Sequence, residues 1–118
     1  MSSKLLLFSF LLLIGVFPTP APAHEIHGIN VSLLVYNILQ CESSLRHNVV
    51  GDQHLQYPAK GIAQFQERTF KYLQKKANKP ELCWESAKDQ IVLLKWAITR
   101  GYGSYWTCYR IVTKEGTR

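Results

Sequence analysis

The sequence predicts a mainly α domain that carries one small irregular or hairpin lobe between its first two helices. Apolar residues recur at steps of three and four near residues 31–41, 61–77 and 84–100, which is the period of an amphipathic helix. Residues 44–60 lack this period and contain Gly-Asp and Tyr-Pro turn signals. Such dipeptides are typical of loops, so we expect the lobe there.

The first 23 residues have the three parts of a secretory signal peptide. Lys4 precedes an almost wholly apolar run from Leu5 to Phe17, and the segment ends in Ala-Pro-Ala, a small-residue cleavage pattern. The run is shorter than the roughly 20 apolar residues of a membrane span; an uncleaved amino-terminal anchor is the alternative. We expect cleavage after Ala23, no stable membrane span afterwards, and a protein that is secreted or held in the periplasm or cell envelope.

The mature chain, residues 24–118, is long enough for one domain and too short for two. Its formal charge is +5, because the signal peptide removes one lysine from a total of +6. A diffuse positive charge favours polyanions such as nucleic acid, anionic lipid or an acidic wall polymer. Export argues against nucleic acid, so we expect a wall or envelope partner and a monomeric protein.

The first helix is predicted over Val31–Cys41, with Asn30 as its N-cap. The second is predicted from Gly61 to Ala77 and the third from Trp84 to Arg100. Gly101 ends the third helix, because glycine tolerates a left-handed backbone. One more short helix is expected over Ser104–Tyr109.

Three cysteines in an exported chain indicate one disulfide and one free thiol. The predicted third helix would carry Cys83 roughly 20 Å or more from the far end of that helix, and Cys108 lies just beyond that end. We therefore favour a pairing of Cys41 with Cys108, while the other two pairings stay open.

Two short motifs follow each other along the chain at a spacing that suggests a family. Glu42-Ser43 closes the first predicted helix, and Gly61-Ile-Ala-Gln64-Phe follows 19 positions later. In this the sequence resembles the lytic transglycosylases and goose-type lysozymes, in which a Glu-Ser pair closes the first long helix and a Gly-x-x-Gln segment follows. The resemblance covers about residues 31–108 and implies a lysozyme-like α+β fold.

The resemblance implies cleavage of the β-1,4 bond between N-acetylmuramic acid and N-acetylglucosamine in peptidoglycan, with Glu42 as the general acid and base. A carboxyl does this best when burial raises its pKa towards neutrality. Glu42 ends an apolar helix, and a helix carboxy terminus disfavours an anion. The alternative is an ordinary solvated glutamate.

The remaining candidate residues are assigned by the same resemblance. Asp52 would orient water or stabilise positive charge on the sugar, unless Gly-Asp is simply a turn. Ser43 would orient the glutamate or bind an acetamido group, unless it is only a helix-terminal hydroxyl. Gln64 would hydrogen-bond an N-acetyl group, and Gly61 would let the backbone approach the sugar.

Aromatic residues are further candidates for sugar binding. Tyr57 would form a wall of the cleft, and Tyr102 and Trp106 would stack on sugar faces, although carboxy-terminal aromatics commonly belong to the core. The family usually has an Ala-x-x-Tyr-Asn-Ala-Gly type segment in a late helix, and residues 96–102 read WAITRGY instead. Both the anhydro-forming transglycosylase and the hydrolysing muramidase therefore stay open.

Two other functional classes of protein are alternatives to the enzyme. One is a secreted wall-binding module that keeps the fold without the activity, and the other is a membrane-active basic helical protein. We expect no cofactor and no metal site, because the His24–His27 segment lacks the spacing of a His-Glu-x-x-His zinc helix. A copper chelate at an amino-terminal His24 would belong to β-sandwich enzymes, whereas this chain is predicted to be helical.

Overall fold

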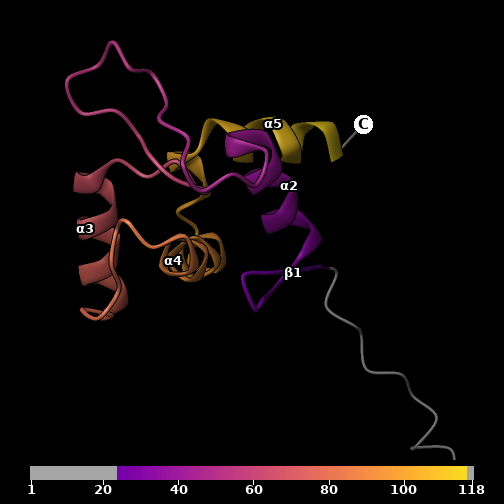
Figure 1. The fold of residues 1–118 in the computed structure, drawn as a ribbon. Coiled ribbons are helices and arrows are strands. Elements are labelled where there is room, and N and C mark those ends of the chain that lie inside the picture. The colour runs from indigo at the N-terminus through magenta and orange to yellow at the C-terminus, as the bar shows by residue number, and fades with distance from the viewer. Residues whose placement is uncertain (1–23, 117–118) are drawn as a thin grey trace, which may run out of the picture.

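Four α-helices and one short β-hairpin make up residues 24–116, the part of the chain that the structure, a computed structural model, describes (Figure 1). About half of these residues are helical, so a mainly α or α+β domain is confirmed. The predicted signal peptide, residues 1–23, lies outside the described residues. The elements are β1 (His24–Ile26), β2 (Ile29–Val31), α2 (Leu33–Ser43), α3 (Glu67–Ala77), α4 (Ala87–Thr99), the 3-10 helix η1 (Gly103–Tyr105) and α5 (Thr107–Gly116).

The amino-terminal hairpin was not expected from the sequence. β1 and β2 are antiparallel, with Ile26 opposite Ile29. His27 and Gly28 connect them with φ of 51° and 78°, and two positive φ angles in a two-residue loop are the geometry of a type I′ turn. The hairpin packs on α2 and α4.

The first helix begins two residues later than predicted. Val31 belongs to β2, and the side chain of Ser32 accepts the N–H of Val35 at 3.2 Å. The N-cap is therefore Ser32, and the prediction of Asn30 was wrong because Asn30 is paired in the hairpin. The helix ends at Ser43, so Glu42 lies in its last turn as predicted.

The second helix begins at Glu67, and the prediction of Gly61 was wrong. Residues 61–64 form a tight turn in which Gly61 has a φ of 90° and Gln64 a φ of 53°. Lys60 and Phe65 exchange two backbone hydrogen bonds around this turn, at 3.0 and 3.2 Å. Ile62 and Phe65 are nevertheless fully buried, which explains why their spacing resembled that of a helix.

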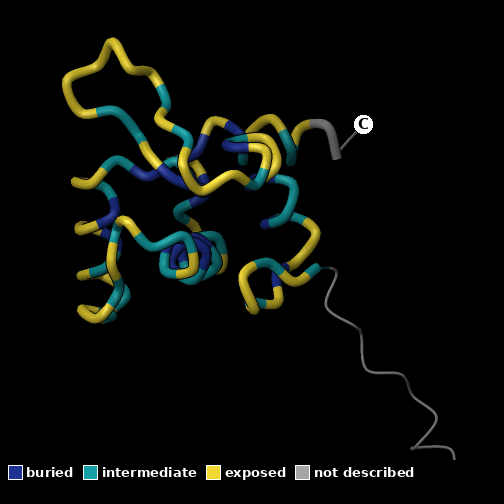
Figure 2. The backbone as a smooth tube through the Cα atoms, in the orientation of Figure 1, coloured by how far each residue is buried: buried dark blue, intermediate teal, exposed yellow. Residues whose placement is uncertain are grey.

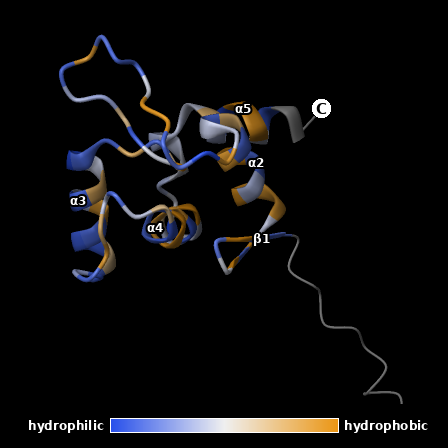
Figure 3. Cartoon of the chain, in the orientation of Figure 1, coloured by the Kyte–Doolittle hydropathy of each residue, from blue (hydrophilic) through white to orange (hydrophobic). Residues whose placement is uncertain are grey.

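The later helices also have different bounds from those predicted. α4 begins at Ala87, after the side chain of Ser86 caps the N–H of Asp89 at 3.1 Å. The predicted short helix over Ser104–Tyr109 is divided: η1 ends at Tyr105, and α5 continues to Gly116. Buried apolar residues of β2, α2, α3, α4, α5 and the turn before α3 form one core. Figure 2 shows the buried positions in dark blue, and Figure 3 shows the hydropathy of the same segments.

Packing between helices sets the position of the lobe. α2 packs against α5 and α4, and α3 packs against α4. The lobe, residues 44–60, projects from the body of the molecule and is mostly exposed (Figures 1 and 2). A backbone hydrogen bond from Gly51 to Ala59 at 2.8 Å closes its base. The irregular lobe between the first two helices is therefore confirmed.

The disulfide joins Cys41 to Cys108, with a Cα–Cα distance of 5.8 Å, and confirms the favoured pairing. It ties the last turn of α2 to the first turn of α5. Cys83 is an exposed free thiol. Among residues 24–116, no helix combines the length and the apolar character that a membrane crossing needs.

Candidate functional site

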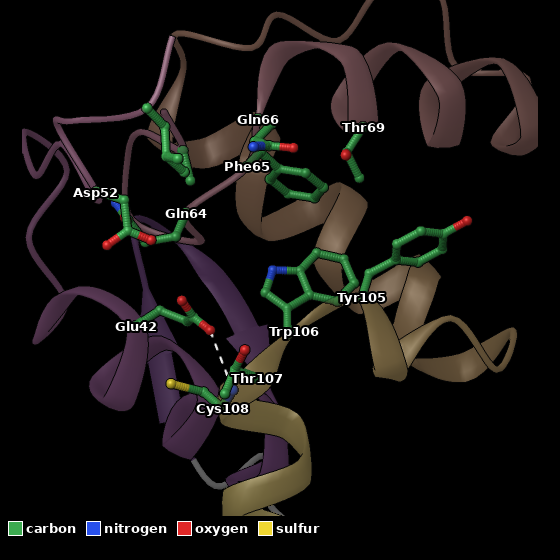
Figure 4. Close-up of a pocket in the computed structure, with 13 residues that line it drawn as sticks. Glu42, Asp52, Gln64, Phe65, Gln66, Thr69, Tyr105, Trp106, Thr107 and Cys108 are labelled. Carbon is green, nitrogen blue, oxygen red and sulfur yellow. Dashed lines mark hydrogen bonds between the residues drawn. The ribbon is translucent and has the colours of Figure 1, made fainter. Parts of the chain in front are cut away.

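A cleft of about 440 Å³ lies between the lobe, the end of α2, the segment that leads into α3 and the start of α5 (Figure 4). It therefore draws on parts of the chain that are far apart in sequence. Its lining residues are Glu42, Gly51, Asp52, Leu55, Ala59, Gln64, Phe65, Gln66, Thr69, Tyr105, Trp106, Thr107 and Cys108.

Glu42 is half-buried, and its carboxylate points into the cleft (Figure 4). Burial raises the pKa of Glu42 above its ordinary value, because removal from water penalises the charged form. The backbone N–H of Cys108, in the first turn of α5, donates to Oε1 at 3.4 Å and partly lowers the pKa again. The carboxyl is thus suited to releasing and recovering a proton.

Asp52 and Gln64 lie beside Glu42 in the same cleft (Figure 4). Asp52 is exposed on the lobe. The amide nitrogen of Gln64 donates to the carbonyls of Val49 at 3.0 Å and Gly61 at 2.9 Å. Gln64 therefore connects its own turn to the lobe at Val49.

Gly51 leaves room for this glutamine. A Cβ at Gly51 would collide with Oε1 of Gln64. The Gly-Asp pair is thus more than a turn signal, because the missing side chain of Gly51 lets Gln64 lie between the lobe and the cleft.

Trp106 forms a wall of the cleft and also belongs to the core. Its side chain is 3% exposed, and its indole N–H donates to the carbonyl of Ala63 at 2.9 Å. Its ring meets that of Phe65 edge-on, with centroids 5.1 Å apart. Tyr105 is 54% exposed and lines the cleft beside Trp106, so a ligand in the cleft can reach its ring.

Four of the predicted site residues lie outside the lining of the cleft. Ser43 is buried, and its hydroxyl lies 2.7 Å from the carbonyl of Ile62 and 3.2 Å from that of Leu39. Tyr57 is exposed on the lobe and lines two other hollows. Tyr102 stacks between the rings of two neighbouring aromatic residues, Trp96 and Tyr105.

Gly61, the fourth of these residues, lies against Gln90. The Gln90 side chain accepts the N–H of Ala63 at 3.0 Å and donates to the carbonyls of Lys60 at 3.1 Å and Trp84 at 2.8 Å. A Cβ at Gly61 would collide with this amide. Glycine is thus required here by packing behind the cleft.

Sequence reasoning missed several polar residues of the lining. Gln66 and Thr69 come from the start of α3, and Thr107 is the first residue of α5. These three residues share one sequence feature: each lies in or next to the first turn of a helix and is adjacent to a buried aromatic residue. That feature becomes specific only when the helix boundaries are known.

The described residues, 24–116, contain no cluster of three or more His, Cys, Asp or Glu side chains that could hold a metal ion.

In comparisons with known proteins, no family model matches the chain, and neither does any curated protein or solved structure.

Proposed function

We propose that the chain is a secreted, monomeric glycosidase of the cell envelope that cleaves the β-1,4 bond between N-acetylmuramic acid and N-acetylglucosamine in peptidoglycan. One observation carries the proposal: Glu42 lies half-buried in the cleft, and burial raises its pKa. An acid that keeps its proton towards neutrality is what glycosidic cleavage needs.

In the first step the protonated Glu42 gives its proton to the glycosidic oxygen, and the bond from that oxygen to the anomeric carbon breaks. The leaving sugar departs as an alcohol, and positive charge develops on the ring that remains. Glu42 is now a carboxylate, and the N–H of Cys108 stabilises it. The same hydrogen bond is weaker when the carboxyl is neutral, so it favours the state that forms during cleavage.

In the second step the Glu42 carboxylate removes a proton from the attacking hydroxyl. If water attacks, the product has a reducing end and the protein is a muramidase. If the 6-hydroxyl of the same sugar attacks, the product has a 1,6-anhydro end and the protein is a lytic transglycosylase. Asp52 faces the same cleft, where its negative charge would stabilise the developing positive charge or orient the water.

A lysozyme-like arrangement is part of the proposal. It is supported by the order of the parts: a glutamate in the last turn of α2, an irregular lobe, and a Gly-x-x-Gln turn that borders the cleft. Sugar contacts are assigned to Gln66, Thr69, Tyr105 and Thr107, which line the cleft, rather than to Ser43.

The second candidate is a wall-binding module without activity. It is favoured by the use of the Gln64 amide nitrogen within the protein, because both of its hydrogen bonds go to backbone carbonyls of the chain. Such a module would hold a glycan in the same cleft and release nothing.

Digestion of purified peptidoglycan separates these functions. The purified chain is incubated with the polymer, and the soluble fragments are identified by mass. Anhydro ends indicate the transglycosylase and reducing ends the muramidase. Retention of the protein on the polymer without soluble fragments would contradict cleavage and support the binding module.

A further inference from the structure

A row of basic side chains follows the outer face of α3. Arg68, Lys71 and Lys75 are three or four positions apart within α3, a spacing that places side chains on one face of a helix. These three positions span about 10 Å at 1.5 Å per residue. Lys79 follows just beyond the helix, after the left-handed C-cap Asn78. Arg68, Lys71 and Lys75 are exposed, and Lys79 is half-buried. The hydrophilic side of α3 faces away from α4 (Figure 3).

Two hollows lie along this row, and one of them shares a lining residue with the cleft that contains Glu42. One has a volume of about 490 Å³ and the other about 290 Å³. The larger is lined by Tyr57, Gln66, Glu67, Arg68 and Lys71, and the smaller by Lys71, Gln74, Lys75, Asn78, Lys79 and Pro80. Gln66 also lines the cleft, and Lys71 lines both hollows. We call these two adjoining hollows, lined by residues between Gln66 and Pro80 and by Tyr57, the α3 groove.

The charges of the α3 groove are almost uncompensated. Within residues 24–116 the structure gives Arg68, Lys75 and Lys79 no ion pair. Lys71 pairs with Glu67 at 3.3 Å, but both side chains are about half or more exposed, and such surface pairs contribute little. Because Arg68, Lys71 and Lys75 are exposed on α3, the packing of that helix does not require them. Like charges in one row repel each other, so an anionic ligand would relieve that repulsion.

We propose that the α3 groove binds an anionic, phosphodiester-linked polymer of the cell wall. The three cations of α3 recur about every 5–6 Å along the helix, and Lys79 lines the same hollow as Lys75. This repeat matches a ligand whose charge also repeats along a chain. Lysine acts as a point-charge partner for phosphate. The groove holds this polymer next to the cleft, so the polymer anchors the protein where peptidoglycan is available.

The groove and the proposed cleavage are independent. Binding in the groove needs no proton transfer and no contact with Glu42, whereas cleavage needs no contact with Lys75 or Lys79. If the protein does not bind the polymer, it can still cleave peptidoglycan, and if it does not cleave peptidoglycan, it can still bind the polymer. The two proposals can therefore fail separately.

The test measures binding of the purified chain to a purified poly(glycerol phosphate) wall polymer over a range of salt concentrations. Lys75→Gln/Lys79→Gln removes two charges from the groove. Lys76→Gln/Lys88→Gln removes two exposed charges that line none of the hollows described above. We expect about tenfold weaker binding and a shallower salt dependence for the groove variant, and a change within about twofold for the control. Circular dichroism checks that both variants fold.

Three results would overturn the proposal. Equal losses in both double variants would show that the charge acts diffusely. Binding that does not change with salt would exclude a charge-based groove. Tighter binding of a single-stranded DNA oligonucleotide with the same number of phosphates would identify a nucleic-acid surface instead. Retained polymer binding by Glu42→Gln is expected, because that substitution leaves the groove intact.

Discussion

Glu42 accepts the backbone N–H of Cys108 at 3.4 Å, and its neighbour Cys41 is joined to the same Cys108 by the disulfide. The covalent bond thus holds the start of α5 against the end of α2, where the carboxyl lies. Burial and this hydrogen bond act on the pKa of Glu42 in opposite directions, and burial has the larger effect.

Ionisation of Glu42 is expected to destabilise the fold. Below the pKa of the unfolded chain, both states keep the proton and burial has no pH-dependent cost. As the pH rises from there through the higher folded pKa, the unfolded state loses its proton first, so the free energy of unfolding falls. Glu42→Gln should therefore be more stable than the wild type at about pH 7, and the difference should disappear near pH 4.

Denaturant titrations at both pH values measure this effect. Glu81→Gln removes the same charge from an exposed position and controls for net charge. If Glu42→Gln and Glu81→Gln shift the midpoint equally at neutral pH, burial of Glu42 is not the cause.

Removal of the disulfide should destabilise the chain strongly. The bond closes a loop with a sequence separation of 67, for which the loss of loop-closure entropy in the unfolded chain corresponds to about 4 kcal/mol. Cys41→Ser/Cys108→Ser should lower the unfolding midpoint accordingly and release the start of α5 from Glu42. Thiol titration of the native wild type should give one reactive thiol, that of Cys83, and three would contradict the pairing.

Ser43→Ala should affect stability rather than sugar binding. The hydroxyl is buried and lies 2.7 Å from the carbonyl of Ile62, and loss of such a bond costs about 1–2 kcal/mol. The KM of any cleavage should stay unchanged, because Ser43 does not line the cleft. Ser104→Ala, at an exposed position, is the matched control. A raised KM with unchanged stability would restore the substrate-binding role that the resemblance implied.

Gly61→Ala should be more harmful than Gly28→Ala. Both glycines have a positive φ, which costs alanine about 1 kcal/mol. Only at Gly61 would the new Cβ also collide, with the side chain of Gln90, whereas Gly28 has nothing within 4 Å. The collision adds about 1–3 kcal/mol. If Gly61→Ala and Gly28→Ala lower the thermal unfolding midpoint equally, the turn behind the cleft shifts to make room for the new Cβ and the predicted collision does not occur.

Local patterns in the sequence were sufficient to predict the helical core, the lobe and the position of Glu42 at a helix end. Apolar spacing of three and four predicts α4 well, because most of its apolar side chains face one core. The cysteine pairing followed from helix length, since α4 separates Cys83 from Cys108. The helices and the lobe depend on neighbours in sequence, which a single chain displays directly.

Tertiary contacts determine the features that were missed. Ile62 and Phe65 have helical spacing, but Gln90, far along the chain, holds the backbone of their turn through two hydrogen bonds, to Lys60 and Ala63. The amino-terminal hairpin has strands of only three residues, which are too short to display a clear alternation. The hydroxyl of Ser43 was assigned to the substrate because its real partner, Ile62, is 19 positions away.

The most direct test of the proposed cleavage compares the wild type, Glu42→Gln and Glu81→Gln on purified peptidoglycan. The rate of release of soluble muropeptides is measured by mass spectrometry, with protein bound to the polymer measured in the same samples. We expect release by the wild type and by Glu81→Gln, and a rate at least about 100-fold lower for Glu42→Gln with binding retained. Release by Glu42→Gln at the wild-type rate would contradict the assignment of Glu42 as the acid.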